Sequence, residues 1–245
     1  MTSLTGKLVR IELRLMTRDP MVLTFVFVFP VVTMLIIGGS FGTAPDPAFD
    51  HANPAHWYVA SYLTVVIAAT GLIMLPVHLA SYRERGVLRR FAAAGFPRWS
   101  FAAAQLIVGL VTTAVSCAIL LLVAAPTYGI PTMHGGWRPV LALALGALGF
   151  VSLGVLFGTV LRSARAAQAI GLILFFPSFL LGAGGPPPNV MGSVTSHVAD
   201  VVPLTWVTRA TRDPWLGLGD ATVPLVAVAL LALVATVAAA RRAVL

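Results

Sequence analysis

The densest cluster of charge in the sequence reads Tyr82-Arg83-Glu84-Arg85-Gly86-Val87-Leu88-Arg89-Arg90-Phe91. It opens a segment, 82–100, that lies between two long apolar runs at 58–80 and 101–125. The chain around it is 58% hydrophobic and only 10% charged. A charged segment between two such runs indicates a connection at a membrane surface.

The spacing within 82–100 predicts a short amphipathic helix. One face of that helix would carry Val87, Leu88, Phe91 and Gly95, and the other Arg85, Arg89 and Arg90. Gly86 and Pro97 are expected to break the helix near its ends. An ordinary basic loop that only fixes the topology is the alternative.

Composition excludes a soluble domain, because soluble chains carry about 25% charged residues. Six apolar runs predict an all-α polytopic membrane protein, and they lie at 21–41, 58–80, 101–125, 139–161, 166–185 and 222–240. The runs do not alternate in polarity, as a β-barrel would require. Pro126 is expected to end the third run and Pro177 to interrupt the fifth, while Trp57 and Tyr58 are expected at a membrane interface.

Residues 1–20 predict a basic helix lying in the headgroup region. The apolar positions recur at helical spacing and are Leu4, Leu8, Ile11 and Leu15. The polar side carries Lys7, Arg10, Arg14 and Arg18. A simple positively charged tail is the alternative.

The charges predict the orientation. Only three of the 16 Lys and Arg residues fall in the expected outer segments, namely Arg138, Arg209 and Arg212. The net charge of +8 therefore reflects a bias between the two sides of a membrane and not a nucleic-acid surface. The positive-inside rule predicts that both termini are cytoplasmic. Residues 186–212 combine prolines with apolar positions, which predicts two short outer helices that dip back against the membrane.

The sequence predicts no catalytic, cofactor or metal residues. It contains neither a phosphate-binding loop nor a zinc-protease motif, and its one cysteine is Cys117. No charged residue lies near the middle of a run, as a proton- or ion-driven carrier usually requires, so the energy for any transport is expected to come from elsewhere. His78, near the end of the second run, is expected to be a hydrogen-bonded structural histidine, with a proton relay as the alternative.

The order of these features resembles ABC-2 type exporter permeases, and the closest branch resembles the daunorubicin-resistance type of antibiotic exporters. The likeness covers essentially the whole chain. Its most specific parts are Arg83-Glu84-Arg85-Gly86-Val87-Leu88-Arg89-Arg90 and Pro203-Leu204-Thr205-Trp206-Val207.

The resemblance implies a single transmembrane domain over 1–245 that works with a separate ATP-binding subunit and a second permease. The coupling helix that contacts this subunit would be 82–100, and its contact residues would be Tyr82, Arg83, Glu84, Arg85, Gly86, Val87, Leu88, Arg89, Arg90 and Phe91. The connecting helix would present Lys7, Arg10, Arg14 and Arg18. An outer gate would be shaped by Pro186, Pro203, Leu204, Thr205 and Trp206. ATP and Mg²⁺ would be bound by the partner and not by this chain.

A hydrophobic drug or antibiotic is the expected cargo. Its path would be lined by aromatic and small polar residues of the second and fifth runs, namely Tyr62, Thr70, Phe175, Phe176, Ser178 and Phe179. Export of a lipid or lipid-linked glycan and a non-transporting membrane scaffold remain as alternatives. A lipid-modifying enzyme is disfavoured because no paired acids or nucleophile–base set are present.

Overall fold

The computed structural model describes residues 2–93, 95 and 98–244. Every regular element in that part of the chain is a helix. Pro97 and positions 94 and 96, which belong to the predicted coupling segment, lie outside the described residues, and so does the side chain of Leu4.

Within the described ranges, six helices are long and apolar enough to cross a membrane. Two of them are composite. Span one joins α2 (Pro20–Val22), the π-helix η1 (Leu23–Val28) and α3 (Phe29–Ser40). Span two joins α4 (Pro54–Ala68), the π-helix η3 (Ala69–Met74) and α5 (Leu75–Glu84). The other four are α7 (Arg98–Tyr128), α8 (Arg138–Val160), α9 (Ala164–Gly182) and α12 (Thr222–Val244). The predicted six-span, all-α fold is confirmed.

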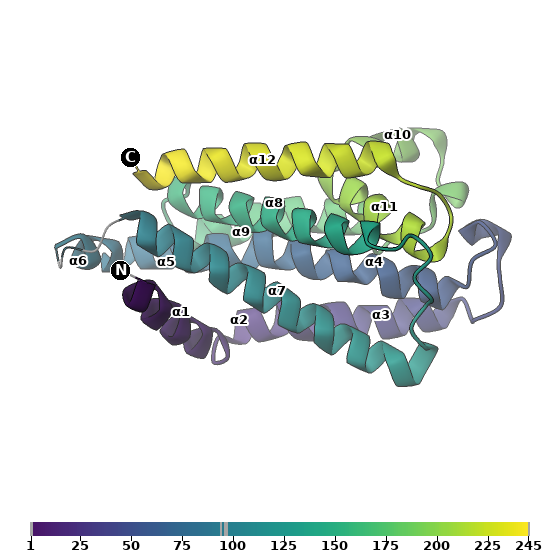
Figure 1. The fold of residues 1–245 in the computed structure, drawn as a ribbon, viewed down its shortest axis with the longest axis horizontal. Coiled ribbons are helices and arrows are strands. Elements are labelled where there is room, and N and C mark those ends of the chain that lie inside the picture. The colour runs from purple at the N-terminus through teal and green to yellow at the C-terminus, as the bar shows by residue number, and fades with distance from the viewer. Residues whose placement is uncertain (1, 94, 96–97, 245) are drawn as a thin grey trace.

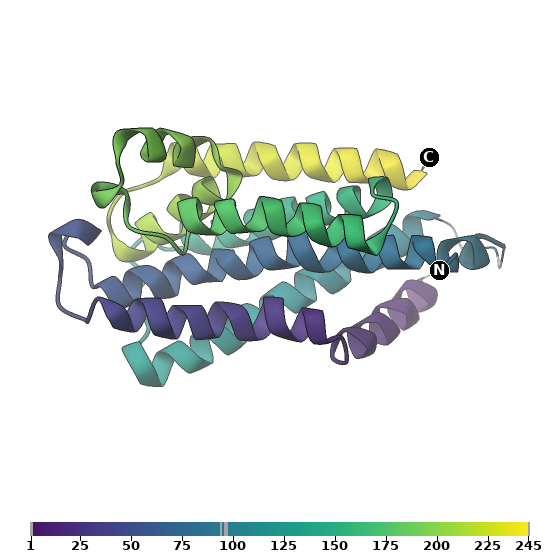
Figure 2. The same ribbon diagram turned by 180° about the vertical axis from the view of Figure 1, so that it is seen from behind.

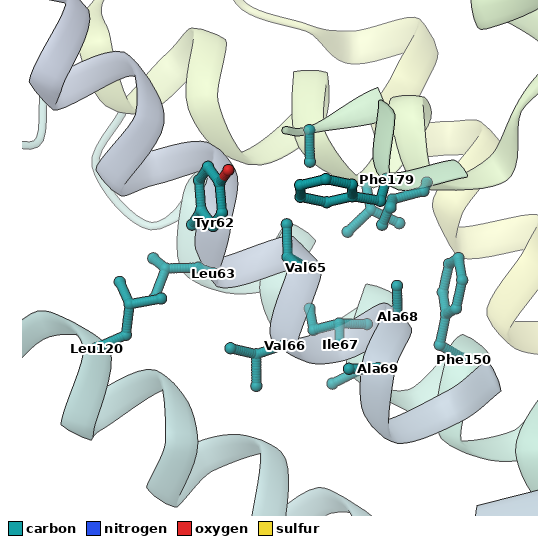
Figure 3. Packing of buried hydrophobic residues seen from close by; sticks show 14 of the residues in the cluster. Tyr62, Leu63, Val65, Val66, Ile67, Ala68, Ala69, Leu120, Phe150 and Phe179 are labelled. Carbon is teal, nitrogen blue, oxygen red and sulfur yellow. The ribbon is translucent and has the colours of Figure 1, made fainter. Parts of the chain in front are cut away.

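Span two is the centre of the bundle. It is 89% buried over its most apolar window, whereas the other five spans are buried by half or less. It runs through the middle of the bundle, with α8 and α12 on one side and α3 on the other (Figures 1 and 2). Successive residues of α4 pack against partners on several neighbouring helices, including Leu120, Phe150 and Phe179 (Figure 3). A helix that is apolar on all sides is expected in such a position.

The connecting elements are divided between the two ends of the bundle. One end carries α1 (Thr2–Met16), the short helix α6 (Val87–Ala93) and both marked chain ends (Figure 1). We call it the α6 end. The opposite end carries α10 (Ser193–Val201), α11 (Pro203–Leu216) and the short 3₁₀-helices η2 (Pro47–Phe49) and η4 (Pro188–Val190). The two termini thus share one end, while the side of the membrane on which that end lies stays a prediction.

Each π-helix ends two residues before a proline. Pro30 has no N–H to offer the carbonyl of Val26, and the Ser116 hydroxyl of α7 donates to that carbonyl instead. Pro76 likewise leaves the carbonyl of Leu72 without its helical donor, and Gly171 of α9 packs directly against this carbonyl. The irregular backbone is therefore covered by neighbouring helices, as it must be within a membrane.

Close helix approach at η3 depends on glycine. A Cβ added at Gly71 would collide with the backbone carbonyl of Phe150, and one added at Gly154 would collide with the carbonyl of Gly71 itself. Small residues allow backbones to approach in this way, which is how membrane helices gain packing energy without a hydrophobic driving force. Span two and α8 are thus fixed at a separation that tolerates no side chain.

Two expectations about single residues were wrong. Pro126 and Pro177 lie inside α7 and α9, which continue past them. A proline removes one backbone hydrogen bond, and in an apolar environment continuing the helix leaves fewer polar groups unpaired than ending it. Trp57 and Tyr58 do not face lipid as interface anchors would, because both are buried beneath η2, where Phe49 packs against each ring at 5.7 and 5.8 Å.

Candidate functional site

The charged segment is divided between two helices. Span two continues to Glu84, and the chain then turns at Gly86, whose φ of +69° suits glycine and disfavours other residues. After this turn α6 begins at Val87. Tyr82, Arg83 and Glu84 therefore belong to the last turn of a membrane span, and the short helix is shorter than the predicted 82–100.

Arg83 and Glu84 connect this last turn to the two helices beside it. Nη1 of Arg83 donates to the backbone carbonyl of Thr159 near the end of α8. Oε2 of Glu84 accepts from the backbone N–H of Ala164, 3.1 Å away, at the start of α9. A carboxylate is favourable at a helix N-terminus because the first N–H groups lack helical partners. The two residues thus hold α5 against the turn between α8 and α9.

A second contact joins α5 to α1. Nε2 of His78 donates to Oε2 of Glu12 at 2.8 Å, and the Tyr82 hydroxyl donates to the same oxygen at 3.1 Å. Glu12 is only 3% exposed. His78 is therefore a hydrogen-bonded histidine in this structure, as the sequence suggested.

α6 has one packed face and one free face. Leu88 and Phe91 pack against a small core of Leu79, Phe101, Val155 and Ala239, whereas Val87 is half-buried outside that core. The side chains of Arg85, Arg89 and Arg90 are exposed. On α1, Lys7, Arg10 and Arg14 are exposed as well, and so is Arg18 just beyond it. The α6 end therefore presents two basic helices that are fastened to the bundle from within.

The residues predicted to line a substrate path fall into two groups. Tyr62, Thr70 and Phe175 are fully buried within the one chain, and Phe179 is 6% exposed. Phe176 is 41% exposed on the surface of α9, and the hydroxyl of the half-buried Ser178 bonds to the carbonyl of Leu174 in the same helix.

The structure brings most of these aromatic rings together around one residue that the sequence did not single out. The ring of Phe29 lies 5.8, 6.4 and 5.4 Å from those of Phe175, Phe176 and Phe179. Phe179 of α9 in turn lies 6.0 Å from Tyr62 of α4, and the two rings lie beside each other (Figure 3). We call these five residues the aromatic cluster. Thr70, one of the predicted path residues, lies apart from it in η3, bonded to the Val66 carbonyl.

Two of the five predicted gate residues line a small cavity at the opposite end of the bundle. Pro186 and Thr205 line it together with Trp57, Arg209 and Arg212. Its volume of about 20 Å³ would hold one water molecule. The other three gate residues lie on α11, where Pro203 begins the helix and Leu204 is buried.

Two polar contacts hold α11 to α10 beside this cavity. Nε1 of Trp206 donates to the backbone carbonyl of Asp200 at 2.7 Å, and Arg209 forms a 2.7 Å ion pair with the carboxylate of the same residue. Both of these contacts between α10 and α11 are made to the same residue, Asp200.

Arg212 is a buried cation that the sequence did not mark as special. Its guanidinium lies 3.6 Å from the centre of the Trp57 ring and bonds to the Asp213 carboxylate at 2.9 and 2.8 Å. Burial lowers the pKa of Arg212, and the charge of Asp213 opposes that shift. A buried arginine needs both partners, because an unpaired charge in such a place is costly.

Two missed residues had a signal in the sequence. Glu12 is the one acidic position on the stripe of α1 that also holds Leu8 and Met16, both of which are buried. A carboxylate on the apolar side of a helix indicates a buried partner. Phe29 directly precedes the proline of span one.

In the part of the chain that the structure describes, no three His, Cys, Asp or Glu side chains lie close enough to hold a metal ion. A search of curated proteins found no match to the chain. A family model described as ABC-2 type transporter matches residues 4–214. The chain belongs to the ABC-2 type transporter family. It is thus a multi-pass membrane permease, and the ABC-2 match extends from α1 through α11.

Proposed function

We propose that this ABC-2 permease exports hydrophobic drugs or antibiotics with energy from a separate ATP-binding subunit. The observation that carries the proposal is the construction of the α6 end. There, a short helix with an exposed basic side follows directly from the central span, which is bonded to α1, α8 and α9. A force applied to α6 would therefore reach four other elements without passing through a flexible linker.

The partner would bind ATP and Mg²⁺ and would contact the exposed arginines of α6 and α1. Two permeases and two such subunits would form the working assembly. Closure of the ATP-binding subunits would move both copies of α6 and switch the bundle between two arrangements. Packed helices support such switching because they move as rigid bodies between discrete states.

The aromatic cluster supports a hydrophobic cargo. Phe176 offers an exposed ring on α9, and behind it the half-buried ring of Phe29 and the buried rings of Phe175, Phe179 and Tyr62 lead inward. Apolar aromatic surfaces bind amphipathic ligands through few fixed polar contacts. The cargo would pass between two permeases along α9. It would leave at the end of the bundle opposite α6, near the small cavity that Thr205 lines.

Purification tests the partnership. A C-terminal tag would be used to isolate the protein gently from its native membrane, and the co-purifying chains would be identified. We expect a stoichiometric ATP-binding subunit. A chain that emerges alone under several mild detergents would contradict the proposal and favour a scaffold.

Two variants test whether α6 couples the ATP-binding subunit to export. Glu84→Ala removes the bond to Ala164, and Gly86→Pro forces a negative φ on a position that requires +69°. We expect both proteins to reach the membrane and to lose export. Unchanged export in both would exclude α6 as the coupling helix.

A comparison of cargoes tests the substrate class. Phe176→Ala should weaken export of hydrophobic cationic dyes several-fold, since it removes an exposed ring that no other described ring replaces on that surface of α9. Phe41→Ala removes a similarly exposed ring directly after α3 (49% exposed) and serves as the matched control. Transport of a fluorescent phospholipid but of no dye by the unaltered protein would instead identify a lipid exporter.

A further inference from the structure

Glu12 is the only acidic residue of α1, and it faces the opposite way from the basic residues of that helix. Lys7, Arg10 and Arg14 are exposed, whereas Glu12 is 3% exposed. Burying a carboxylate is costly unless hydrogen bonds or opposite charge compensate for the lost water. A buried acidic residue would not strengthen the binding of a cationic helix to a membrane surface or to a partner, so Glu12 is expected to have another role.

The two partners of Glu12 lie one helical turn apart on α5. His78 and Tyr82 donate to the same carboxylate oxygen at 2.8 and 3.1 Å, and their rings are 4.5 Å apart. Residues four apart share a helix face, so one side chain of α1 holds two successive turns of α5. We call Glu12, His78 and Tyr82 the clamp.

The clamp lies directly beside the contacts that hold the rest of the α6 end. Arg83 and Glu84, the next two residues, bond to α8 and α9. The ring of Tyr82 also lies 5.9 Å from that of Phe101, which packs against Phe91 of α6 at the same distance. α1 is thus joined through Tyr82 to the helix that follows Gly86.

A π-helix adjoins each of the two segments that the clamp joins, on the side away from the α6 end. α1 leads through Asp19, whose carboxylate caps α2, into η1, and α5 is preceded by η3. The two π-helices pack against each other in the bundle. Such segments are rare and occur often at functional sites. The segment from α1 to α2 and the helix α5 therefore each have the clamp near one end and a π-helix at the other.

From this arrangement we propose that Glu12 is a positioning residue for energy coupling. It binds α1 to α5, so that α1, α5 and α6 move as one body that pivots at the paired π-helices. This proposal rests on the proposed function, because it concerns how ATP-driven movement of α6 reaches the spans.

The first test is the number of cargo molecules moved per ATP in liposomes that contain the permease and its ATP-binding subunit. Glu12→Ala should keep complex assembly and ATP hydrolysis but lower this ratio by roughly tenfold, a usual size for coupling between two sites. Glu12→Gln should stay close to the unaltered protein, because its amide oxygen accepts the same two hydrogen bonds.

Two further variants separate coupling from loss of structure. Asp220→Ala breaks a 2.8 Å ion pair with Arg138 at the opposite end of the bundle and should leave the ratio unchanged. The double variant Glu12→His with His78→Glu exchanges the two residues and restores a hydrogen bond between the same positions. Its number of cargo molecules moved per ATP should return most of the way from the Glu12→Ala value to that of the unaltered protein.

The second test needs no transport and so remains informative if the proposed function fails. Spin labels at Ile11→Cys and Ala93→Cys, both exposed positions, would be introduced after the single cysteine is removed by Cys117→Ala. The distance between the labels should be narrowly distributed, and Glu12→Ala should broaden it while Asp220→Ala does not. The proposal would be overturned by an unchanged distribution, by an unchanged transport ratio in Glu12→Ala, or by loss of the ATP-binding subunit from that variant.

Discussion

At the scale of single residues, specific partners compensate for several of the buried polar groups of this permease. The Ser116 hydroxyl donates to the Val26 carbonyl, to which Pro30 cannot donate. Arg212 contacts both the Asp213 carboxylate and the Trp57 ring. Each such pair adds little to the free energy of unfolding, but a buried polar group left without a hydrogen-bond partner lowers it by about 1–3 kcal/mol. Single substitutions at these positions should therefore have effects out of proportion to their size.

Ser116→Ala provides the sharpest test at this scale. It removes the Ser116 donor from the Val26 carbonyl, so we expect the free energy of unfolding to fall by about 1–3 kcal/mol. Thermal unfolding in detergent would measure the change. Ser40→Ala is the matched control, because the Ser40 hydroxyl is exposed and bonds only to the carbonyl of Ile36 in its own helix. Equal melting temperatures for the two variants would mean that Val26 has another donor.

At the scale of elements, span two combines tight packing with an irregular backbone. η3 lies between α4 and α5, and the backbones of α8 and α9 pack closely against its residues Gly71 and Leu72. A π-helix forms fewer regular hydrogen bonds than an α-helix, so its neighbours must supply the order. The packing of α8 onto η3 should therefore determine whether span two folds correctly.

Gly71→Ala tests this dependence. The added Cβ would meet the Phe150 carbonyl, a backbone atom that cannot turn aside, and such overpacking costs typically about 1–3 kcal/mol and sometimes more. We expect a lower melting temperature and a smaller yield of monodisperse protein. Gly6→Ala makes the same substitution on α1, where nothing lies within 4 Å, and should not destabilise the protein. Equal stability of the two variants would contradict the described α8–η3 contact.

At the scale of the whole molecule, charge and topology agree. The α6 end carries both chain ends and the exposed arginines of α1 and α6, whereas the opposite end carries the paired Arg209 and the buried Arg212. Free cations gather at one end, and those at the other are neutralised locally. This is the distribution that the positive-inside rule requires of a protein whose α6 end faces the cytoplasm.

Cysteine labelling in intact cells would establish that orientation. In the Cys117→Ala background, Asn189→Cys is exposed at the end opposite α6 and should react with a membrane-impermeant maleimide. Ala93→Cys, exposed at the end of α6, should react only after the cells are permeabilised. The reverse pattern would place both termini outside the cell and would remove the basis for an ATP-binding partner at α6.

The sequence by itself determined the number of spans, the segregation of charge and the existence of α1 and a short helix beyond Gly86. These properties are local, because each apolar run must satisfy its own backbone and each charged segment must stay near water. The same reasoning failed at Pro126 and Pro177, where a local helix-breaking preference yielded to the apolar surroundings.

Only the tertiary structure decided which groups meet. Glu12 and His78 are 66 residues apart, and Phe29 reaches the rings of α9 across the bundle. Helical periodicity assigns a residue to a face but does not say which helix covers that face. The partner follows from how closely the spans approach, which at η3 depends on backbone contacts that glycine alone permits.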